Sequence, residues 1–302
     1  MTDAGWSTWP APAKLNLFLH VVGRRSDGYH LLQTCFQLVD WGDELRLRIR
    51  QDGLIRHTEP VCGIAADGEL CLRAAAALRR ATGCRPGVDI ALKKRIPVGG
   101  GLGGGSSDAA TVLVVLNALW ATGLEQEALC ELALGLGADV PLFVRGRSAW
   151  AEGVGEVLTP IDLPERWYLL VDPGIRVSSA ELFGAGQLTR NAAPLTIPRF
   201  ISGADTGNAF EPLVRERFPE VARAFDWLGR HGDAGMGAPR LTGSGSCAFL
   251  PLISHAAGQG LLAQCPPDMR CHLVRGVTRS PLFDRLDSWN QDTISIGASP
   301  SW

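Results

Sequence analysis

The sequence predicts an α+β protein with two lobes, and three observations support this prediction. The 302 residues are enough for two domains of ordinary size. Strand-like segments open the chain, and strands then alternate with helices in both halves. Pro160 and Pro164 bracket a short polar segment that suits a domain boundary. We therefore expect one lobe over residues 1–160 and a second lobe over residues 161–302.

The first lobe begins with strands and continues with helices. Polar and apolar side chains alternate around Lys14, which is typical of a strand with one buried face. The Asp27-Gly28 step is a turn signal, and Gly83 is typical of a helix end. Asp139 and Pro141 should end the last helix and return the chain to a strand. In order, we expect strands at residues 11–22, 31–39 and 43–50, a helix at 69–81, a strand at 88–96, and helices at 109–120 and 125–136.

The second lobe also alternates strands with helices, after a loop-rich stretch of Pro and Gly residues that reaches Gly207. Its sequence predicts strands at residues 167–171, 247–252 and 270–277, helices near 210–217, 221–230 and 255–265, and a tight turn at 242–246. We expect residues 280–302 to form a loosely held tail.

Charge and composition exclude several classes of partner. The net charge of −2 provides no basic field, which argues against nucleic acid or an anionic membrane as a partner. The N-terminus has an acid where a secretory signal carries basic residues, and the apolar stretch at residues 109–119 is too short to span a bilayer. Eight cysteines occur without a C-x-x-C pair, so we expect free thiols in a reducing cytoplasm.

The strongest functional signal is the glycine-rich run at residues 97–110, where six glycines occupy seven positions from Gly99 to Gly105. Backbone without side chains approaches a ligand closely, and its successive N–H groups form a nest for an anion. The run also opens a helix, whose first N–H groups attract phosphate. These features predict a phosphate-binding loop that cradles a nucleotide.

Three other interpretations of this run fit less well. A Walker A loop requires Lys followed by Ser or Thr after the last glycine, whereas Gly105 is followed by Ser106. Gly99, Gly101 and Gly104 match G-x-G-x-x-G, but no second strand ends at an acid about twenty residues on. A flexible linker would have polar flanks, and here a strand and an apolar helix enclose the run.

A kinase also has to orient and activate the acceptor hydroxyl, and Lys14 and Asp139 are the natural pair for this task. Lys14 begins an otherwise apolar strand, and Asp139 stands in an apolar segment where an idle charge would be costly. The aspartate would accept the hydroxyl proton or align the hydroxyl, while the lysine neutralises the transferred phosphoryl group. Each residue considered alone is more often an ordinary surface charge.

A second turn of small residues, Thr242-Gly243-Ser244-Gly245-Ser246, precedes a predicted strand. Such turns are common without any function. Because a phosphate loop occurs elsewhere in the chain, we interpret this turn as a second nest that closes over the nucleotide.

Together, Pro12-Ala-Lys14-Leu-Asn16, the run from Pro97 to Ser107 and the turn at 242–246 resemble the three motifs of the GHMP family of small-molecule kinases, in the same order and spacing. The resemblance implies a two-domain GHMP kinase fold, with an N-terminal lobe like domain 2 of ribosomal protein S5 and a ferredoxin-like C-terminal lobe. It also implies ATP and Mg²⁺ as cofactors. We assign no residue of the chain as a metal ligand.

Within that family, the segment from Gly23 to Thr34 resembles the branch that phosphorylates a cytidine-diphosphate substrate. The reaction implied is transfer of the γ-phosphate of ATP to the 2-hydroxyl of a methylerythritol moiety in non-mevalonate isoprenoid biosynthesis. Lys14 and Asp139 match the family's catalytic pair. The nucleotide-binding positions implied are Leu70, Lys94, Pro97, Gly99, Gly100, Gly101, Leu102, Gly103, Gly104, Gly105, Ser106 and Ser107. The substrate-binding positions implied are Asn16, Tyr29, His30, Phe183, Thr242, Gly243 and Ser244.

Two departures and two alternatives remain at this point. Glu69 stands where relatives often carry Asn beside the adenine, and near Asn208 only that residue and Glu211 match a family element. The alternatives are another GHMP small-molecule kinase, of the homoserine or mevalonate type, and a non-catalytic nucleotide-binding module. We expect a monomer or a weak homodimer.

Overall fold

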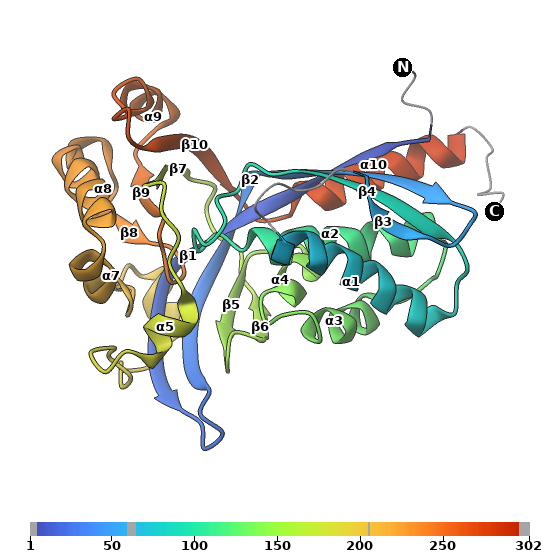
Figure 1. The fold of residues 1–302 in the computed structure, drawn as a ribbon. Coiled ribbons are helices and arrows are strands. Elements are labelled where there is room, and N and C mark those ends of the chain that lie inside the picture. The colour runs from blue at the N-terminus through green and yellow to red at the C-terminus, as the bar shows by residue number, and fades with distance from the viewer. Residues whose placement is uncertain (1–4, 59–64, 205, 296–302) are drawn as a thin grey trace.

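The structure, a computed structural model, describes residues 5–58, 65–204 and 206–295, and it is an α+β fold built on two long strands (Figure 1). β1 (Ser7–Arg24) and β2 (His30–Arg50) form an antiparallel hairpin that runs through both halves of the molecule. The sequence predicted two strands at 31–39 and 43–50, and the structure joins them into one strand, in which the pairing with β1 resumes at Gly42 opposite Pro12 after a register shift.

In the half of the molecule that contains α1 (Ala65–Thr82) and α2 (Gly104–Leu119), helices cover the strands. Figure 1 shows α1 and α2 together on one side of the strands, and α10 (Pro281–Ser295) runs beside β1. Buried apolar side chains of β2, α1 and α2 form the largest core cluster. The other elements of this half are β3 (Ile55–His57), β4 (Gly87–Lys93), α3 (Gln126–Leu134), α4 (Val140–Arg145), β5 (Ala149–Glu152) and β6 (Val157–Pro160).

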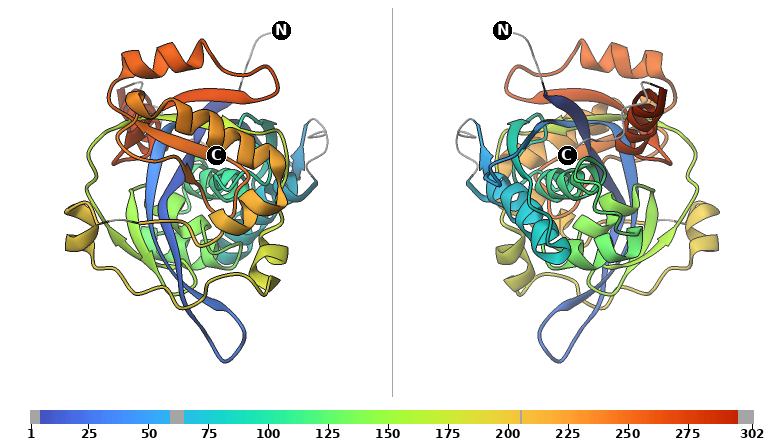
Figure 2. Two further views of the ribbon diagram at one scale, coloured as in Figure 1. Left: turned by 90° about the vertical axis from the view of Figure 1, so that its left-hand side faces the viewer. Right: turned by 90° about the vertical axis from the view of Figure 1, so that its right-hand side faces the viewer.

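The second half carries its own strands and helices and is connected to the first through the sheet. β10 (Arg270–Val277) lies between β7 (Trp167–Asp172) and β2, where Gly276 and Val277 pair with Val39 and Leu38. Buried side chains of α8 (Pro219–Arg230), the helix that faces the viewer in the left-hand view of Figure 2, belong to a second core cluster. The remaining elements are β8 (Arg240–Leu241), β9 (Ala248–Leu252), α5 (Ser179–Gly184), α6 (Ile197–Ile201), α7 (Glu211–Arg217), α9 (His255–Leu262) and a 3₁₀ turn at Gly232–Ala234.

Three expectations from the sequence are wrong. Asp139 does not lead into a strand, because Pro141 is well suited to the first turn of α4. Residues 281–295 form α10 rather than a loose tail, since Leu282 is buried in the main core and Trp289 packs edge-on against Trp9. Cys265 and Cys271 form a disulfide and are not free thiols, whereas Cys62 lies outside the described residues.

Within the described residues, no helix is both long and apolar enough to cross a bilayer.

Candidate active site

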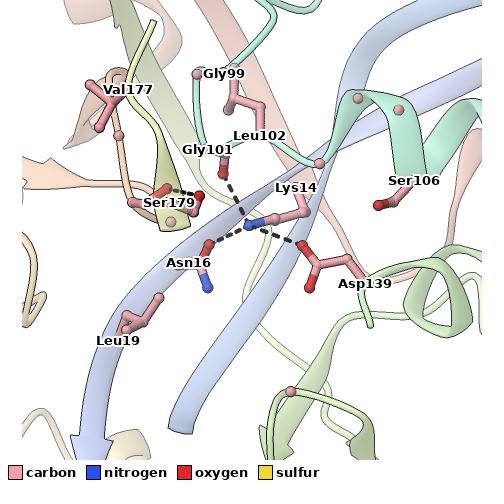
Figure 3. A pocket seen from close by; sticks show the side chains of 18 of the residues that line it. Lys14, Asn16, Leu19, Gly99, Gly101, Leu102, Ser106, Asp139, Val177 and Ser179 are labelled. Carbon is pink, nitrogen blue, oxygen red and sulfur yellow. Dashed lines mark hydrogen bonds and ion pairs between the residues drawn. The ribbon is translucent and has the colours of Figure 1, made fainter. Parts of the chain in front are cut away.

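A cavity of about 350 Å³ lies where β1, the glycine-rich loop, the start of α2 and the turn after β8 meet (Figure 3). Most of the residues predicted from the sequence line this cavity. They are Lys14, Asn16, Leu70, Lys94, Pro97, Gly99, Gly100, Gly101, Leu102, Gly103, Gly104, Gly105, Ser106, Asp139, Phe183, Gly243 and Ser244. Tyr29, His30, Ser107 and Thr242 are not among the residues that line it.

Lys14 lies at the centre of the cavity, and its ammonium group is almost fully buried. The register of β1 against β2 shifts between Pro12 and Lys14, and such a bulge re-aims the side chain that follows it. The ammonium donates to Asn16 Oδ1 at 2.5 Å and to the carbonyl oxygen of Gly101 at 3.0 Å. Burial lowers the pKa of Lys14 below its ordinary value, and the nearby carboxylate of Asp139 opposes part of that decrease.

Asp139 approaches Lys14 from the opposite wall of the cavity, at the start of α4. Its Oδ2 atom lies 3.7 Å from Lys14 Nζ, and about a third of its side chain is exposed. The two residues are 125 positions apart in the sequence, and the fold brings them together as predicted. At this separation the pair attracts electrostatically without a short hydrogen bond, so the carboxylate keeps free acceptor positions toward the cavity.

Asn16 is two residues from Lys14 and faces the same side of β1. Its amide group donates to Thr34 Oγ1 at 2.9 Å, so the side chain is held while its oxygen accepts from Lys14. The backbone N–H of Asn16 donates to Thr242 Oγ1, and this hydroxyl in turn donates to the carbonyl oxygen of Gly101. Thr242 is fully buried, so its contribution is to connect β1, the loop and the turn rather than to line the cavity.

The glycine-rich loop is held on both sides by backbone hydrogen bonds. Lys14 N–H donates to Leu102 O at 3.1 Å, and Ser246 N–H donates to Gly99 O at the same distance. Gly101 has a φ of 77°, and a β-carbon built there would lie 2.0 Å from the carbonyl oxygen of Thr242. Only glycine therefore fits this position.

The loop ends at Gly103, which has a φ of 73° and precedes the first turn of α2. A β-carbon built on Gly103 would lie 2.9 Å from the Phe143 ring and 3.2 Å from Lys14 Cε. Because this segment carries almost no side chains, the N-terminal N–H groups of α2, an apolar helix of sixteen residues, lie at the cavity wall. Those groups and the positive end of the helix dipole form an anion receptor.

The two serines at this helix start differ in position. Ser106 lines the cavity and is half-buried. Ser107 is fully buried, and its hydroxyl finds no hydrogen-bond partner among the described residues. The structure therefore brings Ser106, but not Ser107, to the cavity surface.

Lys94 lines the cavity but is engaged by two buried carboxylates. Its ammonium lies 2.6 Å from Asp43 Oδ2 and 2.8 Å from Asp108 Oδ2. Burial alone would lower the pKa of Lys94, but the charges of Asp108 and Asp43 outweigh burial and raise it. Asp43 also accepts from the backbone N–H groups of Arg95 and Ile96. This cluster anchors the segment that leads into the loop, and no local sequence pattern predicted these contacts of Asp43 and Asp108 with Lys94.

His30 and Phe183 come together at the end of the β1–β2 hairpin. Their rings stack with centroids 4.9 Å apart and planes 25° apart. Arg190 Nε donates to His30 Nε2 at 2.9 Å. Tyr29 is next to this pair in the chain and remains 62% exposed. Sequence reasoning missed Arg190, because nothing local to residue 190 indicates a contact with His30.

The second turn lies against the loop as predicted. Ser244 lines the cavity, and its hydroxyl is 2.5 Å from that of Ser179 at the start of α5. Asn208 is buried and donates to the carbonyl oxygens of Leu241 and Gly243, so it holds the second turn in place. Leu70 lines the cavity from α1, while the side chain of Glu69 lies outside the described residues.

Comparisons with known proteins agree with this arrangement. Residues 69–147 match the family described as GHMP kinases N terminal domain. A solved structure of Methanococcus jannaschii mevalonate kinase superposes with a TM-score of 0.65 and covers 91% of this chain and 100% of its own, but at 15% identity it supports the fold alone. The fold and the family match define a kinase of the GHMP class, and the predicted α+β fold of that type is confirmed.

More specific relatives share most of the chain. A 4-diphosphocytidyl-2-C-methyl-D-erythritol kinase of Xanthomonas axonopodis pv. citri is 56% identical over 95% of this chain and 96% of its own length. The kinase of the same name from Halorhodospira halophila is 55% identical over 92% and 95%. A crystal structure of 4-(cytidine 5'-diphospho)-2C-methyl-D-erythritol kinase has a TM-score of 0.74 at 34% identity, covering 90% of this chain and 100% of its own. The chain belongs to the 4-diphosphocytidyl-2-C-methyl-D-erythritol kinase family.

Proposed function

We propose that this protein transfers the γ-phosphate of ATP to the 2-hydroxyl of 4-diphosphocytidyl-2-C-methyl-D-erythritol in non-mevalonate isoprenoid biosynthesis. The observation that carries the proposal is the single cavity in which Lys14 and Asp139 face a glycine-rich anion receptor. Family membership narrows the acceptor to the substrate in the relatives' name.

The loop and the start of α2 would hold the polyphosphate of ATP. Backbone N–H groups between Gly99 and Ser106 suit its negative oxygens, and the close packing of the glycines leaves no room for side chains between backbone and ligand. Leu70 supplies an apolar contact for the adenine ring. The turn around Ser244 would close over the nucleotide from the second half.

Phosphoryl transfer then depends on position and charge. The acceptor oxygen attacks the γ-phosphorus while the bond to the β,γ-bridging oxygen breaks, and ADP leaves with that oxygen. Asp139, with free acceptor positions, aligns the hydroxyl and takes its proton. Lys14 stabilises the charge that spreads over the transferred group, and Asn16 holds the ammonium in place.

Mg²⁺ would arrive bound to the phosphates of ATP. Among the described residues, no three His, Cys, Asp or Glu side chains lie together as a metal site. Mg²⁺ commonly binds through substrate phosphates and waters with few protein ligands, so this cavity suits the metal–nucleotide complex. The metal, when bound, supplies further neutralisation of the polyphosphate.

The cytidine end of the acceptor would bind near Tyr29, His30 and Phe183. The exposed Tyr29 ring and the Phe183 ring offer aromatic faces for a base, and His30, next to Tyr29 in the chain, stacks on Phe183. We keep the division into lobes at residue 160, the monomer or weak homodimer, and the cytoplasmic location as predictions.

A substrate panel tests the proposal. The purified chain with ATP and Mg²⁺ is assayed against the cytidine-diphosphate acceptor, homoserine and mevalonate, and ADP release is measured. We expect turnover with the cytidine-diphosphate acceptor alone. Turnover with homoserine or mevalonate would assign a different GHMP kinase, and tight ATP binding without any turnover would indicate a non-catalytic nucleotide-binding module.

A further inference from the structure

Arg190 connects His30 with the segment that contains Phe183, a residue of the cavity wall. Its Nε group donates to His30 Nε2, which is 160 residues away. Its Nη2 group donates to the carbonyl oxygens of Phe183 at 3.0 Å and Ala185 at 2.7 Å, and Nη1 donates to Leu188 O at 3.1 Å. The guanidinium has five N–H donors, and four acceptors occupy most of them in one plane.

All four acceptors are neutral, so in these contacts Arg190 does not form an ion pair with a buried carboxylate. Three of them are carbonyl oxygens in the segment from Phe183 to Leu188, which the guanidinium fork holds in a fixed curve. The fourth is the imidazole that stacks on Phe183. Phe183 itself packs edge-on against Phe210, with ring centroids 4.9 Å apart, so two aromatic contacts fix its plane.

The hydrogen bond from Arg190 also determines which nitrogen of His30 carries the proton. An arginine only donates, so His30 Nε2 has to be the unprotonated acceptor. The proton of the neutral ring then resides on Nδ1, where it is a donor for a ligand. Burial lowers the pKa of His30, and the positive charges of Arg190 and Arg24 lower it further, so the ring is neutral near pH 7.

We propose that Arg190 is a positioning residue for acceptor binding, which holds His30 as an Nδ1–H donor and fixes the Phe183 ring beside it. This inference rests on the proposed function, because it assumes that a pyrimidine nucleotide binds at His30 and Phe183. The ring nitrogen and carbonyl oxygen of cytosine are hydrogen-bond acceptors and suit such a donor. Arg190 itself would not touch the reacting groups at Lys14 and Asp139.

Steady-state kinetics of R190Q provide the first test, with the whole chain, ATP and the cytidine-diphosphate acceptor. We expect the acceptor KM to rise about tenfold, the effect of losing roughly one hydrogen bond, while kcat and the KM for ATP change less than twofold. R190K should show the same rise, since an ammonium group keeps the charge but lacks the planar fork. The matched control is R217Q, which removes the exposed arginine that donates to Gln187 in the same segment.

The second test reads the His30 tautomer directly and requires no substrate. Long-range ¹H–¹⁵N spectra of the free protein distinguish the two neutral tautomers, and H30Q assigns the His30 signal among the six histidines. We expect the Nδ1–H form in the wild type and in R217Q, and a mixture of tautomers in R190Q and R190K. Thermal unfolding of each variant checks that it is folded.

The results that would contradict the role of Arg190 differ from the result that would contradict the proposed function. An Nε2–H tautomer in the wild type, or an acceptor KM in folded R190Q and R190K within twofold of the wild type, overturns the role of Arg190. A wild-type chain that shows the Nδ1–H tautomer but does not phosphorylate the cytidine-diphosphate acceptor overturns the proposed function instead.

Discussion

Lys14 Nζ and Asp139 Oδ2 lie 3.7 Å apart across the cavity, closer to an ion pair than to a hydrogen bond. Lys14 satisfies its ammonium through Asn16 and Gly101 instead, so neither member of the pair is saturated by the other. A hydroxyl can therefore bind Asp139 while the lysine keeps its position beside the loop. The following predictions depend on this arrangement and on the contacts around it.

D139N should reduce turnover while ATP binding is nearly unchanged. Asparagine has the same shape but cannot take a proton, and loss of a positioned base costs roughly 100- to 10,000-fold in rate. Turnover is measured by ADP release and ATP affinity by calorimetry. The control is D162N, which removes an exposed aspartate that pairs with Arg147 and does not line the cavity. Equal turnover in D139N and wild type would exclude Asp139 from the mechanism.

Lys14 should give two pH effects of opposite direction. Because burial lowers its pKa in the folded state, kcat should fall as pH rises through a value below the ordinary 10.4 or so of lysine. In the same range the unfolded chain binds more protons than the folded one, so the free energy of unfolding should rise with pH relative to K14M. Urea unfolding of both proteins between pH 7 and 10 measures the difference. A difference that is constant with pH would contradict the lowered pKa.

K94M should destabilise the protein more than its neighbour K93M. Removal of the ammonium leaves Asp43 and Asp108 buried without it, and breaking a buried ion pair in this way costs about 3–5 kcal/mol. Lys93 is exposed, and its substitution should change stability by less than about 0.5 kcal/mol. Chemical denaturation measures both variants. Equal stability of the two would show that the cluster does not anchor the loop.

Alanine at Gly101 should impair both stability and turnover, whereas alanine at Gly83 should affect stability alone. Both positions have positive φ, which costs roughly 1–2 kcal/mol for an alanine. Gly83 has open space around its missing side chain, while at Gly101 the new methyl group meets the carbonyl oxygen of Thr242. The loop must then move, and a displacement of about 1 Å at a reacting site costs up to roughly 100-fold in rate. Full activity in G101A would mean that the loop geometry is not critical.

Local pattern was sufficient to predict most elements and most of the residues that line the cavity. Alternation around Lys14 predicted a strand, and the glycine run before an apolar helix predicted the loop and α2. The predictions were wrong where one local signal is compatible with two structures. Pro141 breaks a helix in its interior but suits the first turn of a new one, and here it begins α4. Residues 281–295 were predicted to be a tail. Their apolar side chains are buried only by packing against the main core, and the local sequence does not show that contact.

Short stretches of sequence specify the chemical groups that this protein can use: a bare backbone for an anion, a lysine and an aspartate in apolar surroundings, and an aromatic pair with a histidine. These are properties of a few adjacent residues, since backbone freedom and periodicity act over one or two turns. The tertiary structure determines which of these groups meet. It placed Thr242 against Gly101, 141 residues away, bound Lys94 to Asp43, and set Arg190 on His30. Such contacts arise from strand pairing and helix packing across the whole chain, and no local pattern encodes them.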